Sequence, residues 1–356
     1  MEYRQLGHSG LRVSTLTLGT MTFGGQGKFA SVGNTSLAEA KSQIALCMEA
    51  GVNLYDTADV YSDGLSEEIL GKALQQQRHE VLIATKARFP MGTGINQGGA
   101  SRYHIINACE ASLKRLGTDY IDLYQIHEWD GITPVEETLE AMDTLVRSGK
   151  IRYYGVSNYT GWQLMKTLGS AAENHYLRPI SQQIHYTLQA REAEYELLPI
   201  TRDSNLGVLV WSPLAGGLLS GKYRRNQQPE QARHLQGWTE PPIYDTDKLY
   251  DIVDVLVEIA EQRQVSAAQV ALAWLLSRAG VSSIVIGART EAQLTDNLQA
   301  AALTLTQDEL VKLEQVSRPP LLYPYWHQAT TATDRLSSND LQLLQPYIDD
   351  FKKSSS

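Results

Sequence analysis

The sequence predicts an α/β protein whose eight short parallel strands close into a (β/α)8 barrel. Short apolar runs alternate along the chain with longer amphipathic segments, as expected for repeated strand–helix units. Reactive residues follow several of these strands rather than a single one. No segment has the G-x-G-x-x-G spacing of a dinucleotide-binding loop, so a doubly wound sheet is kept only as the structural alternative.

The barrel strands are expected to follow a small N-terminal hairpin over residues 3–13, which turns at Gly7 to Gly10. Each barrel strand is a short run rich in apolar and β-branched residues. The eight runs are 15–19, 52–55, 81–86, 121–127, 151–156, 180–184, 207–211 and 283–286.

The intervening helices carry recognisable start signals. Ser36 and Glu39 have the spacing of a capping box, at the start of a helix that continues to about residue 50. Apolar residues recur on one face over 102–116. Thr133 as N-cap and Pro134 at the first helical position predict the start of another helix.

Some segments break the alternation of strands and helices. A glycine-rich loop over residues 21–29 is expected to border the active site. Residues 223–246 are too long and polar for an ordinary connection, and either an ordered lid or a disordered segment fits them. We expect one domain over residues 1–325. The C-terminal extension, 326–356, is expected to bring the tail over the active site and to end in a flexible segment.

The composition excludes several classes of protein. The 356 residues carry a net charge of −9 and have a sequence pI near 5.4, which argues against a nucleic-acid or anionic-membrane surface. No apolar run approaches the roughly 18 residues of a spanning helix, and the N-terminus lacks the apolar core of a signal peptide. The two cysteines, Cys47 and Cys109, predict buried thiols. We therefore expect a soluble, cytoplasmic protein without a metal site, and the sequence leaves open whether it forms a homo-oligomer.

Four proton-handling residues are expected at one edge of the barrel. Asp56 directly follows the strand 52–55 and Tyr61 lies in the loop after it, while Lys86 and His127 end the next two strands. The carboxyl ends of parallel strands meet at one edge, which is where reactive groups collect in such proteins. Taken singly, each residue has an ordinary explanation as a turn, a packing contact, a solvated charge or a core histidine. Their joint occurrence favours an active site.

With these residues in place, the sequence resembles the aldo-keto reductase superfamily over about residues 3–325. The resemblance rests on six segments in matching order and spacing, which is far more specific than any one of them. The segments are Asn53–Tyr61, the strand ending in Lys86, Asp119–His127, Gly155–Tyr159, Trp211–Tyr223 and Ile286–Asn297. The resemblance implies a (β/α)8 barrel that transfers a hydride between NADPH and a carbonyl compound.

The resemblance also assigns a role to each of the four residues. Tyr61 is expected to protonate the carbonyl oxygen while a hydride reaches the carbon. A free tyrosine has a pKa of about 10, and a nearby Lys86 is expected to lower it. Asp56 would hold Lys86 charged and oriented, and His127 would donate a hydrogen bond to the carbonyl oxygen.

The cofactor contacts are implied in the same way. Ser157, Asn158 and Gln183 are expected to bind the nicotinamide carboxamide, although without the resemblance the first two also fit a simple turn. Trp211 stands where many relatives place a Tyr that stacks on the nicotinamide ring. The remaining expected contacts are Gly19, Thr20, Met21, Ser212, Leu214, Gly216, Lys222, Gly287, Arg289, Gln293 and Asn297.

Arg289 decides which cofactor is expected. It follows the last strand at the edge of a helix, where helix N–H groups and a guanidinium together form a phosphate site. The resemblance assigns it to the adenosine 2′-phosphate, which favours NADPH over NADH, although a solvated cation is the alternative. Gln293 stands where some relatives carry a second cation, so use of NADH stays open.

Aromatic loop residues are expected to form the substrate pocket. The candidates are Phe23, Phe29, Phe89, Trp129, Tyr323 and Trp326. From these we select Phe23 and Trp129. Aromatic walls predict apolar or ring-bearing aldehydes and ketones as substrates.

The leading functional hypothesis is therefore an NADPH-dependent reductase of aldehydes or ketones. A variant within this class works mainly as an NAD(P)+-linked alcohol dehydrogenase. An alternative from another class is a redox-sensing regulatory module with little turnover, like the barrel-type β subunits of potassium channels. A metal-dependent barrel hydrolase ranks last, because no group of histidines and carboxylates stands at the strand ends to hold a metal.

Overall fold

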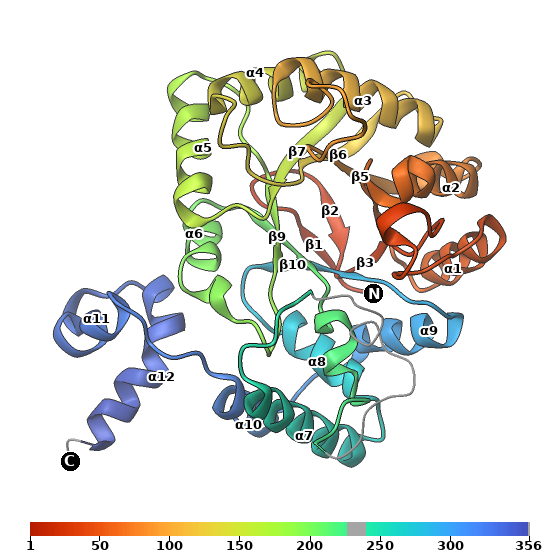
Figure 1. Cartoon of the computed structure of the whole chain (residues 1–356). Coiled ribbons are helices and arrows are strands. Elements are labelled where there is room, and N and C mark those ends of the chain that lie inside the picture. Colours follow the sequence, from red (N-terminus) through yellow and green to blue (C-terminus); the bar gives the residue numbers. More distant parts are fainter. Residues whose placement is uncertain (226–239, 355–356) are drawn as a thin grey trace.

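The chain folds as a closed barrel of parallel strands inside a ring of helices (Figure 1). The computed structural model describes residues 1–225 and 240–354. The barrel strands are β3 Leu16–Gly19, β4 Leu54–Asp56, β5 Leu82–Ala87, β6 Ile121–Ile126, β7 Ile151–Ser157, β8 Ser181–His185, β9 Gly207–Trp211 and β10 Val281–Ile286. They pair in sequence order from β3 to β10, and β10 pairs in parallel with β3 to close the barrel. The predicted (β/α)8 fold is confirmed.

The N-terminal hairpin closes the end of the barrel at which the strands begin. It consists of the antiparallel strands β1 Tyr3–Gln5 and β2 Arg12–Ser14, as predicted. Leu6 and Val13 of this segment are fully buried in one cluster with interior residues of the barrel such as Leu209. A side chain at Gly207, the first residue of β9, would collide with Leu6. The opposite end, where the strands finish, is therefore the end that stays open to ligands.

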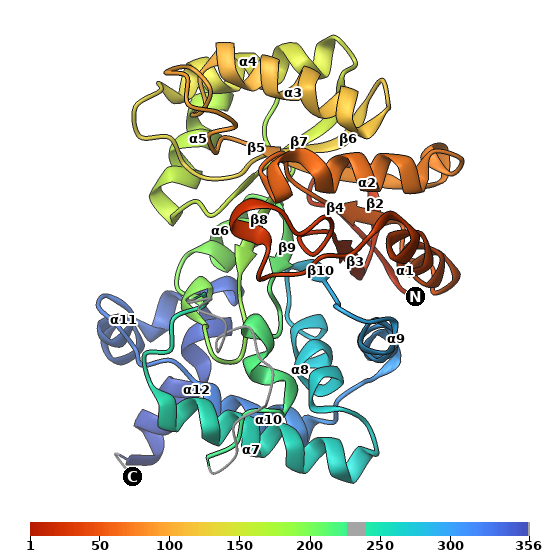
Figure 2. The same cartoon turned by 45° about the vertical axis from the view of Figure 1, so that its right-hand side comes forward.

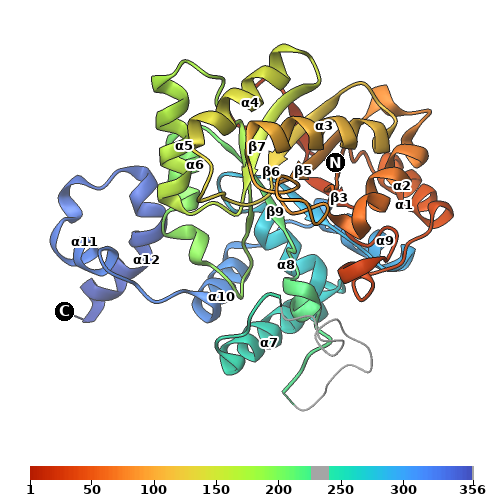
Figure 3. The same ribbon diagram turned by 45° about the horizontal axis from the view of Figure 1, so that its top comes forward.

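The helices cover the outside of the barrel, as Figures 2 and 3 show from two further directions. Those that follow barrel strands in sequence are α1 Leu37–Glu49, α2 Leu65–Leu74, α3 Arg102–Leu116, α4 Val135–Arg147, α5 Gly161–Glu173, α6 Leu197–Asp203, α7 Thr246–Arg263, α8 Ala267–Leu276, α9 Glu291–Gln299 and α10 Gln307–Ser317. The chain then ends in α11 Tyr325–Thr331 and α12 Ser338–Ser354. None of the helices in the described residues is long and apolar enough to cross a lipid bilayer.

The start signals read from the sequence apply to α1 but not to α4. At α1, Ser36 and Glu39 form the predicted capping box. At α4, the N-cap is Pro134, and the helix begins one residue later than predicted. The Thr133 hydroxyl donates instead to Asp130 Oδ2 at 2.7 Å, which ties it to the preceding loop. This corrects the assignment of Thr133 as the cap.

Within its described residues, the excursion between β9 and β10 contains the helices α7 and α8. Before them, the chain after β9 turns through a short 3-10 segment, Ala215–Ser220. The predicted long segment 223–246 falls mostly on residues 226–239, which lie outside the described part of the chain. The choice between an ordered lid and a disordered segment therefore stays open.

The C-terminal tail packs beside the barrel and not over its open end, which corrects the expected position. Figures 1 and 2 show α11 and α12 next to α6, at one side of the ring. Tyr325 stacks on Tyr195 with ring centroids 5.3 Å apart, and Arg202 Nε of α6 donates to Asn339 Oδ1 at 2.6 Å. The division into a domain of residues 1–325 and an extension of 326–356 stays a prediction. The predicted flexible end falls partly on residues 355–356, outside the described residues.

Candidate active site

A cavity of about 950 Å³ opens at the carboxyl ends of the barrel strands. Most of the strand residues that line it stand at strand ends, such as Gly19 on β3, Ser157 on β7 and Trp211 on β9. This is the end of the barrel at which ligand and catalytic sites form in such folds. The predicted residues that line it are Gly19, Thr20, Met21, Asp56, Tyr61, His127, Ser157, Asn158, Gln183, Trp211, Ser212, Leu214, Gly216, Lys222, Gly287, Arg289, Gln293 and Asn297.

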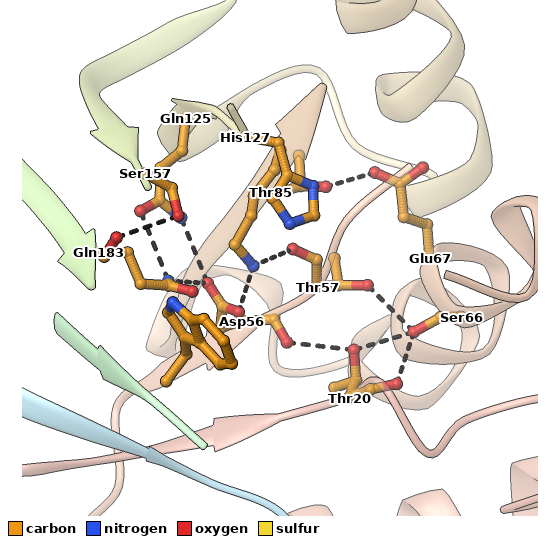
Figure 4. Close-up of polar contacts among 12 residues, drawn as sticks. Thr20, Asp56, Thr57, Ser66, Glu67, Thr85, Gln125, His127, Ser157 and Gln183 are labelled. Carbon is orange, nitrogen blue, oxygen red and sulfur yellow. Dashed lines mark hydrogen bonds and ion pairs between the residues drawn. The ribbon is translucent and has the colours of Figure 1, made fainter. Parts of the chain in front are cut away.

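At the floor of this cavity lies a buried ion pair between Lys86 and Asp56. The Lys86 ammonium donates to Asp56 Oδ1 and, at 2.8 Å, to the carbonyl oxygen of Thr57, and no part of the lysine is exposed. The second carboxylate oxygen of Asp56 accepts from Gln183 Nε2 at 2.9 Å and from Gln125 Nε2 at 3.2 Å (Figure 4). A buried charge is tolerated when it is paired and hydrogen-bonded in this way.

Tyr61 lies above this pair, in the 3-10 segment Tyr61–Gly64 between β4 and α2. Its ring centroid is 5.2 Å from the Lys86 ammonium, 5.3 Å from the Phe29 ring and 5.9 Å from the His127 ring. Burial raises the pKa of the Tyr61 phenol and Lys86 lowers it, with a net shift above the usual value. The phenol therefore carries its proton at neutral pH.

His127 follows β6 and reaches the same cavity. Burial, followed by the positive charges of Lys86, Lys28 and Arg88, holds its pKa well below the usual range. The imidazole is therefore neutral at neutral pH. A neutral imidazole has one N–H donor and one acceptor nitrogen, so His127 can donate a single hydrogen bond into the cavity.

Residues at or near the ends of β7, β8 and β9 form a set of polar and aromatic groups in the same cavity as Asp56 and His127. Ser157 Oγ donates to the Gln183 carbonyl oxygen at 3.0 Å. Asn158 has a positive φ of 58°. Its side chain links the residue that follows β6 to the one at the end of β9. Its Nδ2 donates to the His127 carbonyl oxygen at 3.1 Å, and its Oδ1 accepts from Trp211 Nε1 at 2.9 Å.

Two further cations, Lys222 and Arg289, also line the cavity. Arg289 stands between β10 and α9, and its guanidinium donates to the carbonyl oxygens of Ser31 at 2.8 Å and Val32 at 3.2 Å. Its backbone N–H donates to Gln293 Oε1 at 3.1 Å. The arginine therefore ties the loop after β3 to the start of α9, at the border of the cavity.

The two residues selected for the substrate pocket do not line the cavity. Phe23 is fully buried in the core, next to the backbone bridge between Phe23 and Thr35. Trp129 packs edge-on against Tyr159 and Trp162, at centroid distances of 5.2 and 5.6 Å, away from the cavity. The tail candidates Tyr323 and Trp326 do not line it either.

Phe29 and Phe89, which were candidates but were not selected, form the aromatic wall instead. The Phe89 ring lies 4.7 Å from the His127 ring, and the Lys28 ammonium lies 5.4 Å from both phenylalanine ring centroids. The part of the cavity around Tyr61 and His127 is thus apolar, with one lysine at its border.

Sequence reasoning missed Gln125, whose side chain contacts Asp56. The available sequence signal was an amide side chain in a short run of mostly apolar residues at the end of β6, and the structure shows that it is fully buried. The buried thiols Cys47 and Cys109 are confirmed as free cysteines. Among the described residues, no group of three His, Cys, Asp or Glu side chains could hold a metal ion.

Comparison with known proteins gives a consistent result. A model of the Aldo/keto reductase family matches residues 15–318. A probable voltage-gated potassium channel subunit beta of Arabidopsis thaliana is 38% identical, over 89% of this chain and 96% of that protein. An uncharacterized oxidoreductase of Bacillus subtilis is 38% identical, over 90% and 97%. A versiconal hemiacetal acetate reductase of Aspergillus parasiticus is 36% identical, over 91% and 99%.

Proposed function

The chain belongs to the aldo/keto reductase family, and we propose that it reduces aldehydes or ketones to alcohols with a hydride from NADPH. The family and the relatives named as oxidoreductase and reductase support an oxidoreductase of the carbonyl-reducing type. One observation carries the finer proposal. The protonated Tyr61, the Lys86–Asp56 ion pair and the neutral His127 meet at one end of a single cavity.

The proposed proton transfer starts from Tyr61. NADPH, when bound, supplies the hydride that reaches the carbonyl carbon. The carbonyl oxygen then gains negative charge and takes the phenolic proton of Tyr61. The phenolate that remains is stabilised by the Lys86 ammonium, which lies 5.2 Å from the ring centroid. In the reverse direction the same phenolate acts as the base.

The other residues orient and stabilise the reacting groups. Asp56 holds Lys86 in place through the buried ion pair. His127 remains neutral and donates one hydrogen bond to the carbonyl oxygen, on which charge develops. Phe29 and Phe89 exclude water on the substrate side, which strengthens both interactions.

The residues of the cavity fit a nicotinamide nucleotide. Amide and hydroxyl groups of Ser157, Asn158 and Gln183 lie beside the catalytic residues, where a carboxamide needs both donors and acceptors. The cations Lys222 and Arg289 line the same cavity and can supply the positive charge that phosphates need. We assign Arg289 to the 2′-phosphate, which supports NADPH as the preferred cofactor, and an NAD(P)+-linked alcohol dehydrogenase is the variant of this proposal.

A second function follows from the relatives named as probable potassium channel β subunits. By analogy, the chain would bind the cofactor and act as a redox-sensing regulatory module with little turnover. The complete set of Asp56, Tyr61, Lys86 and His127 favours the enzyme. Steady-state oxidation of NADPH against a panel of aliphatic and aromatic aldehydes separates the two functions. Turnover supports the reductase, whereas tight cofactor binding without turnover of any aldehyde supports the module.

A further inference from the structure

Two buried glutamine side chains meet on the carboxylate of Asp56. Gln125 on β6 and Gln183 on β8 each donate from Nε2 to Asp56 Oδ2, at 3.2 and 2.9 Å. Gln183 Nε2 also lies 3.5 Å from Gln125 Oε1. Figure 4 shows both amides at the Asp56 carboxylate, joined to it and to each other by dashed lines. Three strands that are far apart in the sequence are thereby joined at one carboxylate oxygen.

The chemistry of the carboxylate fixes the orientation of both amides. An ionised carboxylate only accepts hydrogen bonds, so each glutamine must turn its NH2 group toward Asp56. The Oε1 of Gln125 then accepts the second N–H of Gln183. Both hydrogens of the Gln183 amide are thus used within the network.

This orientation leaves the Oε1 of Gln183 as the atom available to a ligand. Gln183 lines the cavity, and its Oε1 accepts no hydrogen bond from the described residues. A carboxamide NH2 group is a donor that this oxygen can accept. If the Gln183 amide were turned over, it would present a donor to the ligand and an acceptor to Asp56.

We propose that Gln125 is a positioning residue, which fixes the Gln183 amide as an acceptor for the nicotinamide carboxamide and completes the hydrogen bonds of Asp56. This inference rests on the proposed function, because it needs a nicotinamide in the cavity. It couples cofactor binding to the Asp56–Lys86 pair through one amide. Loss of Gln125 would leave a buried N–H of Gln183 without an acceptor and would remove one of the two donors to Asp56 Oδ2.

Gln125→Leu tests the proposal, with Gln182→Leu as the matched control. Gln182, on β8, is likewise a buried glutamine. Its Nε2, however, donates to the Leu197 carbonyl oxygen at 3.1 Å, away from Asp56. Gln125→Leu is expected to raise the Kd for NADPH at least threefold and to lower kcat at least tenfold. Gln182→Leu should change both by less than twofold. Gln125→Met, a flexible side chain of similar length, checks that the effect comes from the lost amide and not from packing.

Gln125→Glu provides a second test, the pH dependence of activity, which a change in packing alone would not alter. A protonated glutamic acid at this position can donate to Asp56 and accept from Gln183, as the amide does, whereas the carboxylate cannot donate. The titratable groups around the site are Asp56 on β4 and Lys86 on β5, with Asp59, Tyr61 and His127 interacting with Lys86, while β7 contributes only Gly155 at the paired position. The activity of Gln125→Glu relative to wild type should therefore be highest near pH 5.5 and should fall as the pH rises.

Two results would overturn the proposal. One is a Gln125→Leu protein whose Kd for NADPH and kcat both stay within twofold of wild type. The other is a Gln125→Glu protein that is no more active than Gln125→Leu at pH 5.5. The Kd is measured by quenching of intrinsic fluorescence and needs no turnover. A wild-type protein that binds NADPH but reduces nothing would contradict the proposed function, and the effect of Gln125→Leu on the Kd would still decide this inference.

Discussion

The Lys86 ammonium lies 5.2 Å from the centre of the Tyr61 ring, and the same ammonium pairs with Asp56 in the floor of the cavity. Burial, together with the negative charges of Asp56 and Asp59, raises the pKa of Tyr61, Lys86 lowers it, and the net shift is upward. The sequence-based expectation of a lowered pKa thus describes the effect of Lys86 but not the net shift, which is upward. In the proposed mechanism, Tyr61 keeps its proton at neutral pH until a carbonyl oxygen takes it, and Lys86 then stabilises the phenolate.

Removing one partner of the Lys86–Asp56 pair should harm both stability and activity. Lys86→Met leaves the Asp56 carboxylate buried without its counterion, which is expected to lower the free energy of unfolding by about 3–5 kcal/mol. The double variant Lys86→Met with Asp56→Asn removes both charges and should regain part of this stability without regaining activity. Urea denaturation and kcat measure the two effects. A double variant as unstable as the single one would contradict this view of the pair.

Stability should depend on pH through His185, whose ring packs on Trp211 with centroids 4.6 Å apart. Burial lowers the pKa of His185 to about 4. The unfolded chain, with a histidine pKa of about 6.5, takes up this proton first as the pH falls, and this favours unfolding. The free energy of unfolding should therefore fall between pH 6.5 and 4, and His127 acts in the same direction.

His185→Gln should make that fall less steep, because glutamine takes up no proton in this range. His8→Gln, at an exposed position, is the control and should leave the slope unchanged. Denaturation at several pH values measures the slope. An identical slope in wild type and His185→Gln would contradict the assignment.

Arg289→Ala should weaken the binding of NADPH more than the binding of NADH. Because a hydrogen bond to a charged group contributes about 1.5–3 kcal/mol, the Kd for NADPH is expected to rise at least tenfold. The Kd for NADH, which lacks the 2′-phosphate, should change less than threefold. Lys222→Ala is the matched control and should weaken both cofactors alike, since the pyrophosphate is common to them. An equal rise in the Kd for NADPH and for NADH in Arg289→Ala would contradict the assignment of Arg289 to the 2′-phosphate.

The two phenylalanines Phe89 and Phe23 should respond differently to truncation. Phe89 lines the cavity, so Phe89→Ala is expected to raise KM for aromatic aldehydes several-fold more than for short aliphatic ones. Phe23 lies in the core, so Phe23→Ala should lower the free energy of unfolding by about 3–5 kcal/mol. Its KM values in the folded protein should stay near those of wild type. Aldehyde kinetics and urea denaturation measure these two effects. A changed KM in Phe23→Ala and an unchanged KM in Phe89→Ala would contradict the placing of Phe89 in the cavity wall and of Phe23 in the core.

The barrel was predictable because its evidence is local. Strand runs such as 207–211 and the helix 102–116 have the observed bounds, since apolar periodicity and flanking turns determine them. The edge at which Asp56, Lys86 and His127 meet follows from the parallel topology alone. Loop directions depend on distant contacts. The Ser62 hydroxyl donates to the Phe23 carbonyl oxygen, and contacts of this kind decide that Phe23 faces the core while Phe29 faces the cavity.

Contacts between residues that are distant in the sequence explain the other differences between the sequence-based expectations and the structure. Gln125 lies 69 positions after the carboxylate that it binds, and no sequence pattern joins the two. The aromatic residues of the tail predicted that the tail packs on the protein, but not where it packs. Its position depends on contacts with Tyr195 and α6. The net shift of the Tyr61 pKa depends on burial, which the sequence motif does not give.

The most direct test of the central claim is a single-turnover measurement on wild type and Tyr61→Phe. Each protein is loaded with NADPH, mixed with an aldehyde that wild type reduces, and followed by the loss of NADPH absorbance. Wild type should consume its bound NADPH in one fast phase. Tyr61→Phe should bind NADPH with an unchanged Kd and consume it at least 100-fold more slowly, because general acid catalysis typically contributes about 10²–10⁴-fold. Equal rates in the two proteins would contradict the assignment of Tyr61 as the proton donor.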